Sequence, residues 1–234
     1  FVRYADEIVD TLHGEQQAEM FQRFKEDTYW ALDHGMSSNP ILHAFAKSYA
    51  KYNIDREHVD LFLRSMECDL DRTAYDRQGY DDYIVGSAEV VGLMCLHVFV
   101  FGKRDRYDAL LGHARSLGAA FQKVNFLRDL KDDFEEKGRV YFPGVDMTQF
   151  NAEVKDQIED EIAEDFRDAY KGIVKLPKES RLGVYVAYVY YLRLFQKISA
   201  LPSNRIMEER IRIPNRRKAT LFLSSYLRHS FNLL

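Results

Sequence analysis

The sequence predicts an all-α protein, and three observations predict it. Apolar residues recur at helical spacing, for example at Ile158, Ile162 and Phe166. No stretch alternates polar and apolar residues at the period of a strand, and no Asn-Gly or Asp-Gly pair marks a hairpin. The chain of 234 residues contains only 12 Gly and 5 Pro, which excludes collagen-like and low-complexity classes. We therefore expect one domain, residues 1–234, built from six to eight helices.

Short breaks divide the predicted helices. Residues 1–10 already have a helical pattern, with no N-cap residue before them, so we expect the chain to begin inside a helix and to lack a helix upstream. Residues 34–40 are typical of a loop, whose Asn39-Pro40 pair starts the next helix. Asp55 is a candidate N-cap for the helix that follows it. Further breaks are expected at Gly79 and at residues 138–146, 176–177 and 201–202.

One segment, from Tyr83 to Phe101, is almost wholly apolar. It is long enough to span a bilayer, which takes about 20 residues. Glu89 lies near its centre, where a carboxyl group would be costly in lipid. We therefore expect a central helix of the protein core. Its small residues, among them Gly86 and Gly92, would let another helix approach closely.

Charge and cysteine content narrow the functional classes. The chain has 33 basic and 37 acidic residues, which argues against a nucleic-acid partner. Two cysteines, Cys68 and Cys95, lie among apolar residues, which favours buried thiols in a reduced, intracellular protein. The 7 histidines show no metal-ligand spacing, and no nucleotide-binding glycine motif is present. Neither a metal–histidine centre nor a nucleotide cofactor is predicted.

Aspartates repeat at the spacing of one helical turn near the N-terminus. Asp6 and Asp10 are four residues apart and therefore share one face of a helix, with Arg3 on the same side. One such pair alone is most often a solvated face.

Aspartates at the same four-residue spacing recur in the second half of the chain. Asn125, Asp129 and Asp133 form a stripe at positions i, i+4 and i+8 of a helix. Gln122 and Arg128 flank this stripe. Apolar residues on the other side make the helix amphipathic.

Two carboxylate pairs with arginines suggest diphosphate chemistry. Mg²⁺ prefers oxygen ligands and takes one or two carboxylates together with substrate phosphates, and arginine offers a bidentate fork to phosphate oxygens. Mg²⁺ ions held between two aspartate helices would neutralise the charge of a departing diphosphate. The remaining cation would need an apolar pocket with aromatic faces, and the chain has 15 Tyr and 16 Phe.

Taken in order, these segments resemble the squalene/phytoene synthase family of trans-isoprenoid synthases, over nearly the whole chain and most like its bacterial phytoene synthases. The matching segments are Arg3-x-x-Asp6-x-x-x-Asp10, Tyr83 with the apolar run to Met94, Gln122-x-x-Asn125-x-x-Arg128-Asp129-x-x-x-Asp133 with the loop Arg139-Val-Tyr-Phe-Pro143, and, more weakly, Arg210 to Lys218. The resemblance implies an isoprenoid-synthase helical bundle around a central hydrophobic cavity.

The resemblance also implies an activity. This is the Mg²⁺-dependent head-to-head condensation of two geranylgeranyl diphosphates to phytoene through a cyclopropylcarbinyl diphosphate, a prenyltransferase step of carotenoid biosynthesis, with Mn²⁺ as a substitute metal. Squalene or dehydrosqualene synthesis from two farnesyl diphosphates is the alternative, and squalene alone would need a nucleotide reductant. A non-catalytic binding or assembly relative is a third possibility, which the intact aspartate pairs disfavour. A terpene cyclase would need an Asp-Asp-x-x-Asp signature that this chain does not match well.

Residue roles are carried over by position in the family motifs. The implied metal ligands are Asp6, Asp10, Asn125, Asp129 and Asp133. The implied substrate-binding residues are Arg3, Gln122, Asn125, Arg128, Arg139, Tyr191 and Arg210, and Tyr83 is implied beside the reacting carbons. Glu89 stands where the family often has glycine, and a buried carboxyl group there needs a partner.

The hydrophobic substrate predicts a cytoplasmic protein that binds the membrane surface peripherally without spanning the membrane. The basic stretch from Arg210 to Lys218 is compatible with a solvated helix end, a diphosphate contact at Arg210, or contact with an anionic membrane. The sequence leaves the oligomeric state open.

Overall fold

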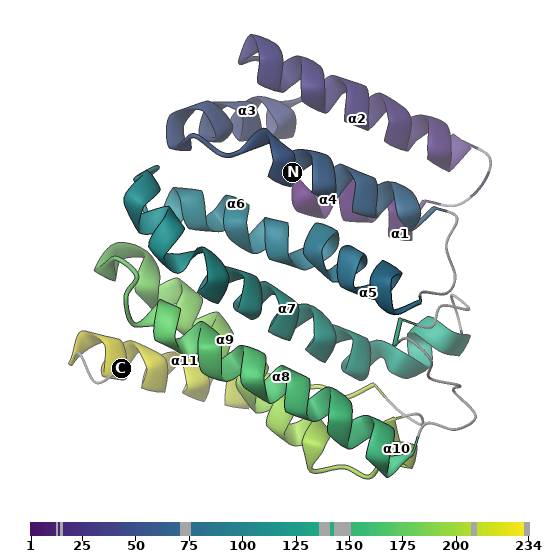
Figure 1. Cartoon of the computed structure of the whole chain (residues 1–234), viewed down its shortest axis with the longest axis vertical. Coiled ribbons are helices and arrows are strands. Elements are labelled where there is room, and N and C mark those ends of the chain that lie inside the picture. Colours follow the sequence, from purple (N-terminus) through teal and green to yellow (C-terminus); the bar gives the residue numbers. More distant parts are fainter. Residues whose placement is uncertain are drawn as a thin grey trace.

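The computed structural model describes residues 1–12, 14, 16–70, 76–135, 141–142, 151–206 and 210–231. All regular structure within these ranges is helical (Figure 1), which confirms the predicted all-α class. The helices are α1 (Val2–Asp10), α2 (Gln16–His34), α3 (Pro40–Tyr52), α4 (Arg56–Cys68), α5 (Arg77–Ile84), a π-helical turn η1 (Val85–Glu89), α6 (Val90–Phe99), α7 (Arg104–Glu135), α8 (Ala152–Ile173), α9 (Lys178–Ser199), α10 (Ser203–Ile206) and α11 (Asn215–Ser230).

The described residues form more helices than the six to eight predicted, namely eleven α-helices and one π-helical turn. One reason is Gly14, whose φ of 110° lies in the region that favours glycine and separates α1 from α2. Other boundaries agree with prediction. The side chain of Asn39 accepts hydrogen bonds from two amides of the first turn of α3, and Pro40 occupies the first helical position. Gly79 does not interrupt a helix, because it lies inside the first turn of α5 and its amide is capped by Asp76.

The predicted central helix is formed by α5, η1 and α6, which run on without a break (Figure 1). Within the described part of the chain, Arg77–Phe99 is the one helix long and apolar enough to cross a membrane, and the core helix of a bundle passes the same test. Here η1 and α6 pack between α4 and α7. The close approach requires glycine, because a Cβ on Gly86 would lie 2.7 Å from Cβ of Ser65 and 2.9 Å from the carbonyl oxygen of Leu61.

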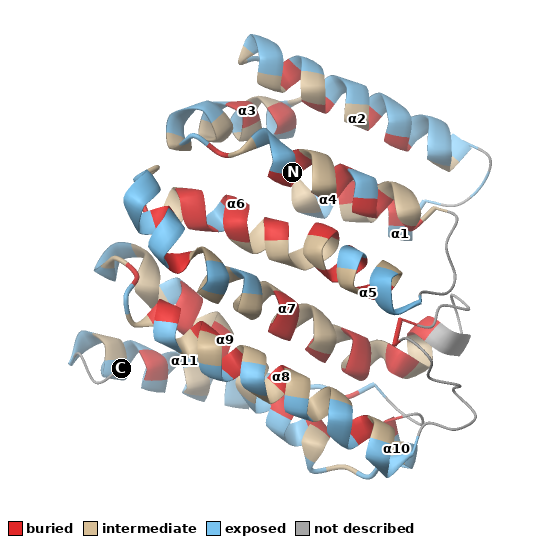
Figure 2. Ribbon diagram, in the orientation of Figure 1, coloured by how far each residue is buried: buried red, intermediate tan, exposed pale blue. Residues whose placement is uncertain are grey.

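Two clusters of buried apolar side chains meet along α6. Val90 and Met94 belong to a cluster with α1 to α4, whereas Leu93 and Leu96 belong to a cluster with α5 and α7 to α10. Figure 2 shows the buried positions facing neighbouring helices and many exposed positions on the outermost helices, α2 and α11. Neighbouring helices are therefore joined by a continuous apolar interior with α6 at its centre.

The longest helix, α7, determines where the predicted site residues lie. It packs against η1, α6, α8 and α9. Its C-terminal end lies at the same end of the bundle as the C-terminal end of α1, on the right of Figure 1. The two aspartate motifs predicted from the sequence thus face the same end of the molecule.

Candidate active site

A cavity of about 410 Å³ lies between the central helix, α7, α8 and α9. Its walls are mostly apolar, and many of the side chains are small; they include Ala88, Val91, Gly92, Leu96, Phe99, Leu110, Ala114, Leu117, Gly118, Phe121, Ala169, Ile173, Leu176, Val184 and Ala187. The predicted central hydrophobic cavity is therefore confirmed. A space of this composition suits a hydrocarbon chain rather than a polar ligand.

Polar groups gather at one end of the cavity. Gln122 and Asn125 on α7 and Tyr191 on α9 line it there. The hydroxyl of Tyr191 donates to Oδ1 of Asn125 at 3.2 Å, and its ring stacks on Phe121 with 4.0 Å between centroids. Asn125 begins the aspartate stripe of α7, so the polar end of the cavity continues into the carboxylates.

Asp129 is held by two arginines. Nε of Arg128 donates to its Oδ1 at 2.9 Å, and Nε of Arg210, which precedes α11, lies 2.7 Å from the same oxygen. A second nitrogen of Arg210 lies 3.7 Å from Asp132, a carboxylate that sequence reasoning did not single out. The hydrogen bond to Asp129 raises the pKa of Arg128 above its ordinary value. Two guanidinium groups thus stand where an anionic ligand with several oxygens would be bound.

The aspartates of α1 lie close enough to affect each other. Burial first, and then the Asp10 carboxylate, raise the pKa of Asp6 to about 6. Arg3, which lowers that pKa only in part, forms an exposed ion pair with Glu7. The end of α1 is fixed by Gln17, whose amide donates to the carbonyl oxygens of Ile8 and Val9. Because the two carboxylates repel each other, a cation bound between them would be stabilised.

Tyr83 lies beside the cavity rather than among its lining residues. It is buried, and its hydroxyl donates to Oδ2 of Asp69 at 2.9 Å. Its ring lies 6.1 Å from that of Phe126 and 5.5 Å from that of Tyr141. The carbonyl oxygen of Tyr83 accepts from Ser87, which does line the cavity. Asp69 was not identified from the sequence, because nothing in the local spacing links it to Tyr83.

The donor atoms of the two motifs fit a magnesium ion. The stripe of α7 presents carboxylate and amide oxygens from one side of a helix, and Asp133 is only 8% exposed. Asp6 and Asp10 add two carboxylates from α1. Oxygen donors with substrate phosphates are the ligands that Mg²⁺ prefers. Arg139 lies outside the described residues, as does most of the predicted loop at 138–146.

Cys95 differs from expectation, and Glu89 and His113 have partners on other helices. Cys95, expected to be a buried structural thiol, faces the cavity and is exposed there, and its deep position raises the thiol pKa. Glu89 finds its partner in Arg115 of α7, whose Nε lies 2.5 Å away. His113, which also lines the cavity, pairs with Asp168 of α8 at 2.9 Å. The contacts of Glu89 and His113 join residues of different helices, so no sequence spacing could have indicated them.

Comparison with known proteins assigns a family. The family model of squalene/phytoene synthase matches residues 1–217. Phytoene synthase 1, chloroplastic, of Arabidopsis thaliana is 26% identical over 218 residues, covering 85% of this chain and 51% of its own length. The 4,4'-diapophytoene synthase of Staphylococcus haemolyticus is 25% identical over 167 residues, covering 68% of this chain and 56% of its own length. The chain thus spans about half the length of these curated relatives.

Solved structures share the fold. A dehydrosqualene synthase in complex with ligand aligns with a TM-score of 0.77 and 18% identity, covering 97% of this chain and 83% of that one. The squalene synthase HpnC from Alicyclobacillus acidocaldarius aligns with a TM-score of 0.70 and 19% identity, covering 89% of this chain and 81% of that one. The fold is therefore the isoprenoid-synthase helical bundle expected from the sequence.

Proposed function

The chain belongs to the squalene/phytoene synthase family, and we propose that it catalyses the Mg²⁺-dependent head-to-head condensation of two isoprenoid diphosphates. The observation that carries the proposal is the stripe of Asn125, Asp129 and Asp133. It continues from the polar end of an apolar cavity, with Arg128 and Arg210 already on Asp129. The polar stripe would bind the charged head group of a substrate, and the adjacent apolar cavity would hold its hydrocarbon tail.

The two aspartate motifs would hold the metal. Asp6 and Asp10 from α1, and Asn125, Asp129 and Asp133 from α7, would supply the oxygen ligands. Bound Mg²⁺ would neutralise charge on the leaving diphosphate.

The arginines would bind the diphosphate itself. Arg128 and Arg210 would exchange part of their contact with Asp129 for phosphate oxygens, and Gln122 would support the amide of Asn125. Arg3 and Arg139 are the remaining proposed diphosphate contacts. Arg3 would have to leave its exposed pair with Glu7, an ion pair of a kind worth little in water.

The reaction would proceed in two ionisations. The first substrate loses its diphosphate with the bonding electron pair and becomes an allylic cation. The double bond of the second substrate attacks that cation, and loss of a proton closes a cyclopropylcarbinyl diphosphate. Loss of the second diphosphate, rearrangement and loss of another proton give the linear polyene. The stacked rings of Phe121 and Tyr191 would stabilise cationic carbons and exclude water. Tyr83 is a further aromatic residue proposed beside the reacting carbons.

The cavity is long enough for the tail of a C20 substrate. On α7 the lining runs from Leu110 to Asn125, which is about 22 Å at 1.5 Å per residue. An extended covalent chain advances about 1.2 Å per bond. The main chain of a C20 isoprenoid therefore needs about 18 Å and that of a C15 isoprenoid about 13 Å. Either tail fits this length, and the proposed substrates are two geranylgeranyl diphosphates with phytoene as the product. Condensation of two farnesyl diphosphates remains the alternative.

Product analysis tests the proposal. The protein is incubated with Mg²⁺ and either diphosphate, with and without NADPH, and the hydrocarbon is identified by mass. We expect a C40 product from the C20 substrate without a reductant. Product from the C15 substrate alone would overturn the chain length, and reductant dependence would indicate squalene. Unchanged product formation by Asp129→Ala, or failure of the wild type to bind diphosphate, would favour the non-catalytic alternative.

The surface of α11 suggests that the protein takes up its hydrophobic substrates at a membrane. Its outer side exposes large apolar residues, Phe222, Leu223, Tyr226, Leu227 and the following Phe231, and its first turn carries Arg216, Arg217 and Lys218. This combination is typical of helices that lie on anionic membranes. We therefore propose peripheral membrane contact through α11.

Sedimentation with vesicles tests the membrane contact. Wild-type protein should sediment with anionic vesicles and be released by salt. The double variant Phe222→Ser, Leu223→Ser should stay in the supernatant, whereas Met36→Ser, which alters an exposed apolar residue elsewhere, should behave as wild type. Equal sedimentation of all three proteins would contradict the proposal.

A further inference from the structure

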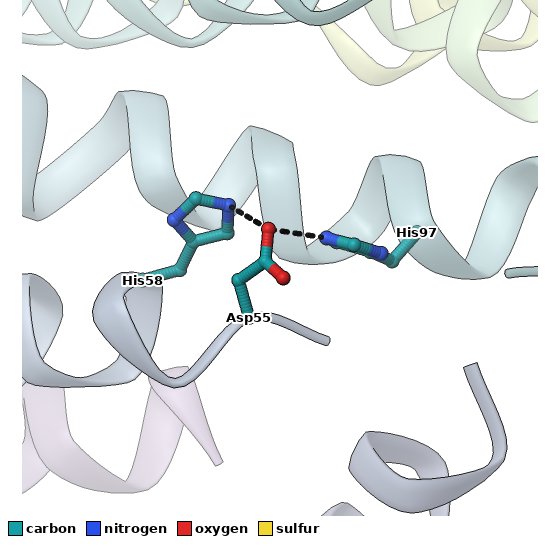
Figure 3. Close-up of side chains that lie close together, drawn as sticks. All are labelled: Asp55, His58 and His97. Atoms are coloured by element: carbon teal, nitrogen blue, oxygen red, sulfur yellow. Dashed lines mark ion pairs between the residues drawn. The ribbon is translucent and has the colours of Figure 1, made fainter. Parts of the chain in front are cut away.

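A group of three side chains at the other end of α7 has the composition of a transition-metal site. Asp55 immediately precedes α4, His58 lies in the first turn of α4, and His97 lies in the last turn of α6. Figure 3 shows one carboxylate oxygen of Asp55 between the two imidazole rings. Oδ2 of Asp55 is 3.8 Å from Nε2 of His58 and 3.5 Å from Nε2 of His97. The three ligand atoms all lie within 4.8 Å of one another.

The two histidines are buried and incompletely bonded. His97 is 2% exposed and His58 is 8% exposed. Nε2 of His97 meets Oδ2 of Asp55 only at 3.5 Å, which is longer than a normal hydrogen bond. Nδ1 of His58 also lacks a partner within the described chain. A buried polar atom without a good hydrogen bond costs about 1–3 kcal/mol. A cation between the His97 ring and the Asp55 carboxylate would satisfy both groups.

Two of the three distances between ligand atoms are close to those of a tetrahedral zinc site, and the third is within 4.8 Å. With zinc–nitrogen bonds of about 2.0–2.1 Å, the ligand atoms of a tetrahedron lie about 3.3–3.4 Å apart. The observed 3.5 Å and 3.8 Å exceed this by only a few tenths of an ångström. Two imidazoles and one carboxylate, with a fourth position left open, are a known zinc donor set. Imidazole nitrogens also distinguish this group from the oxygen donors that suit Mg²⁺.

The surrounding side chains are compatible with a bound ion. Arg104 donates to both oxygens of Asp55 and also binds Asp108, which orients the carboxylate and leaves it further lone pairs. The hydroxyl of Tyr107 is 2.6 Å from Nε2 of His58. It is therefore placed to bond a water in the fourth position once His58 binds metal. Such outer partners commonly orient metal ligands.

We propose that Asp55, His58 and His97 bind a transition-metal dication such as Zn²⁺ and thereby join α4 to α6 at the start of α7. The site is distinct from the proposed magnesium site. α7 begins at Arg104, and Asp129 lies about 38 Å farther along the helix at 1.5 Å per residue. Because Asp55 and His58 come from the start of α4 and His97 comes from the end of α6, the bound ion stabilises the packing between these helices.

The experiment measures binding of Zn²⁺ alone by competition with a chromophoric chelator, in excess Mg²⁺. We expect one Zn²⁺ per chain, an increase in melting temperature on binding, and a loss of affinity of at least about 100-fold in His58→Gln and in His97→Gln. His34→Gln, which alters an exposed histidine of α2, should bind as the wild type does. Asp129→Asn should also bind normally, since it affects only the proposed magnesium site.

Cobalt keeps the test decisive if a histidine variant does not fold. Co²⁺ added to the wild type should give the intense visible absorption of tetrahedral histidine coordination, and Asp55→Asn, nearly identical in shape, should lose it. The proposal is overturned if the wild type binds neither ion, or if the folded His58 and His97 variants bind Zn²⁺ like the wild type. Neither result bears on product formation, so this site and the proposed function fail independently.

Discussion

Nε of Arg210 lies 2.7 Å from Oδ1 of Asp129, so a residue just before α11 is in contact with the aspartate stripe of α7. Arg128 holds the same carboxylate from the neighbouring position. In this arrangement the arginines balance the charge of Asp129 before any cation or diphosphate is bound. In the proposed function, substrate binding would therefore exchange one set of ionic contacts for another.

Arg210→Ala should weaken diphosphate binding more than it slows chemistry. A hydrogen bond to a charged group contributes about 1.5–3 kcal/mol, which corresponds to an increase in KM of about 10- to 100-fold. Steady-state kinetics and inhibition by inorganic diphosphate measure it. Arg212→Ala, which removes another exposed arginine of the same stretch, is the control. An unchanged inhibition constant in Arg210→Ala would remove Arg210 from the site.

Asp6→Asn should stabilise the metal-free protein while it impairs catalysis. Because the pKa of Asp6 is raised from 3.8 to about 6, the folded state favours the protonated carboxyl group, and stability is lost as pH rises through that value. The variant should therefore melt at a higher temperature than the wild type well above pH 6, and at a similar temperature near pH 4. Thermal melting at the two pH values measures this.

Added Mg²⁺ should reverse that difference, because the ion relieves the repulsion only where both carboxylates are present. Asp27→Asn, which alters an exposed aspartate of α2, should show neither effect. A lower melting temperature for Asp6→Asn in metal-free buffer would contradict the electrostatic account.

Cys95→Phe should shorten the usable cavity. The Cys95 side chain faces the cavity from α6, and an aromatic ring there occupies space needed by the longer tail. We expect the ratio of C20 to C15 turnover to fall by about 10-fold or more. Cys95→Ala, which adds no bulk, should keep the wild-type ratio. Parallel assays with both substrates measure the ratio, and equal loss with both would indicate a folding defect instead.

Two glycines of α7 should respond to alanine in opposite directions. A Cβ on Gly118 would lie 2.7 Å from the carbonyl oxygen of Ala88, and backbone cannot give way cheaply, so Gly118→Ala should destabilise by about 1–3 kcal/mol. No described atom lies within 4 Å of a Cβ on Gly112, and Gly112→Ala should stabilise by about 0.5–1 kcal/mol. Urea unfolding measures both. A shift of the same sign in the two variants would contradict the close packing of α7 on η1.

The sequence predicts those parts of the fold that depend on neighbours along the chain. The unbroken apolar run located the central helix, and Asn39-Pro40 located the start of α3, because composition and capping are read from residues close together along the chain. The break at Gly14 was missed because glycine alone does not reveal its own φ. Only the folded chain requires the positive value.

The candidate site divides in the same way. The stripe of α7 is visible in the sequence because its members lie one turn apart on a single helix. The contacts of Asp129 with Arg210 and of Glu89 with Arg115 join residues of different helices, and packing alone brings them together. The same holds for Asp55 and His97: histidine spacing along the chain could not indicate that the fold brings these two side chains and His58 within 4.8 Å of one another.

The division of α6 between two apolar clusters has a consequence for ligand binding. Val90 and Met94 anchor this helix to the layer that carries Asp6 and Asp10, and Leu93 and Leu96 anchor it to the layer that carries Asp129 and Asp133. A diphosphate held by both layers would resist their separation. Amide hydrogen exchange along α6 should therefore slow when Mg²⁺ and diphosphate are added together. The exchange rates of this apolar helix would then indicate that ligand binding holds the two layers together.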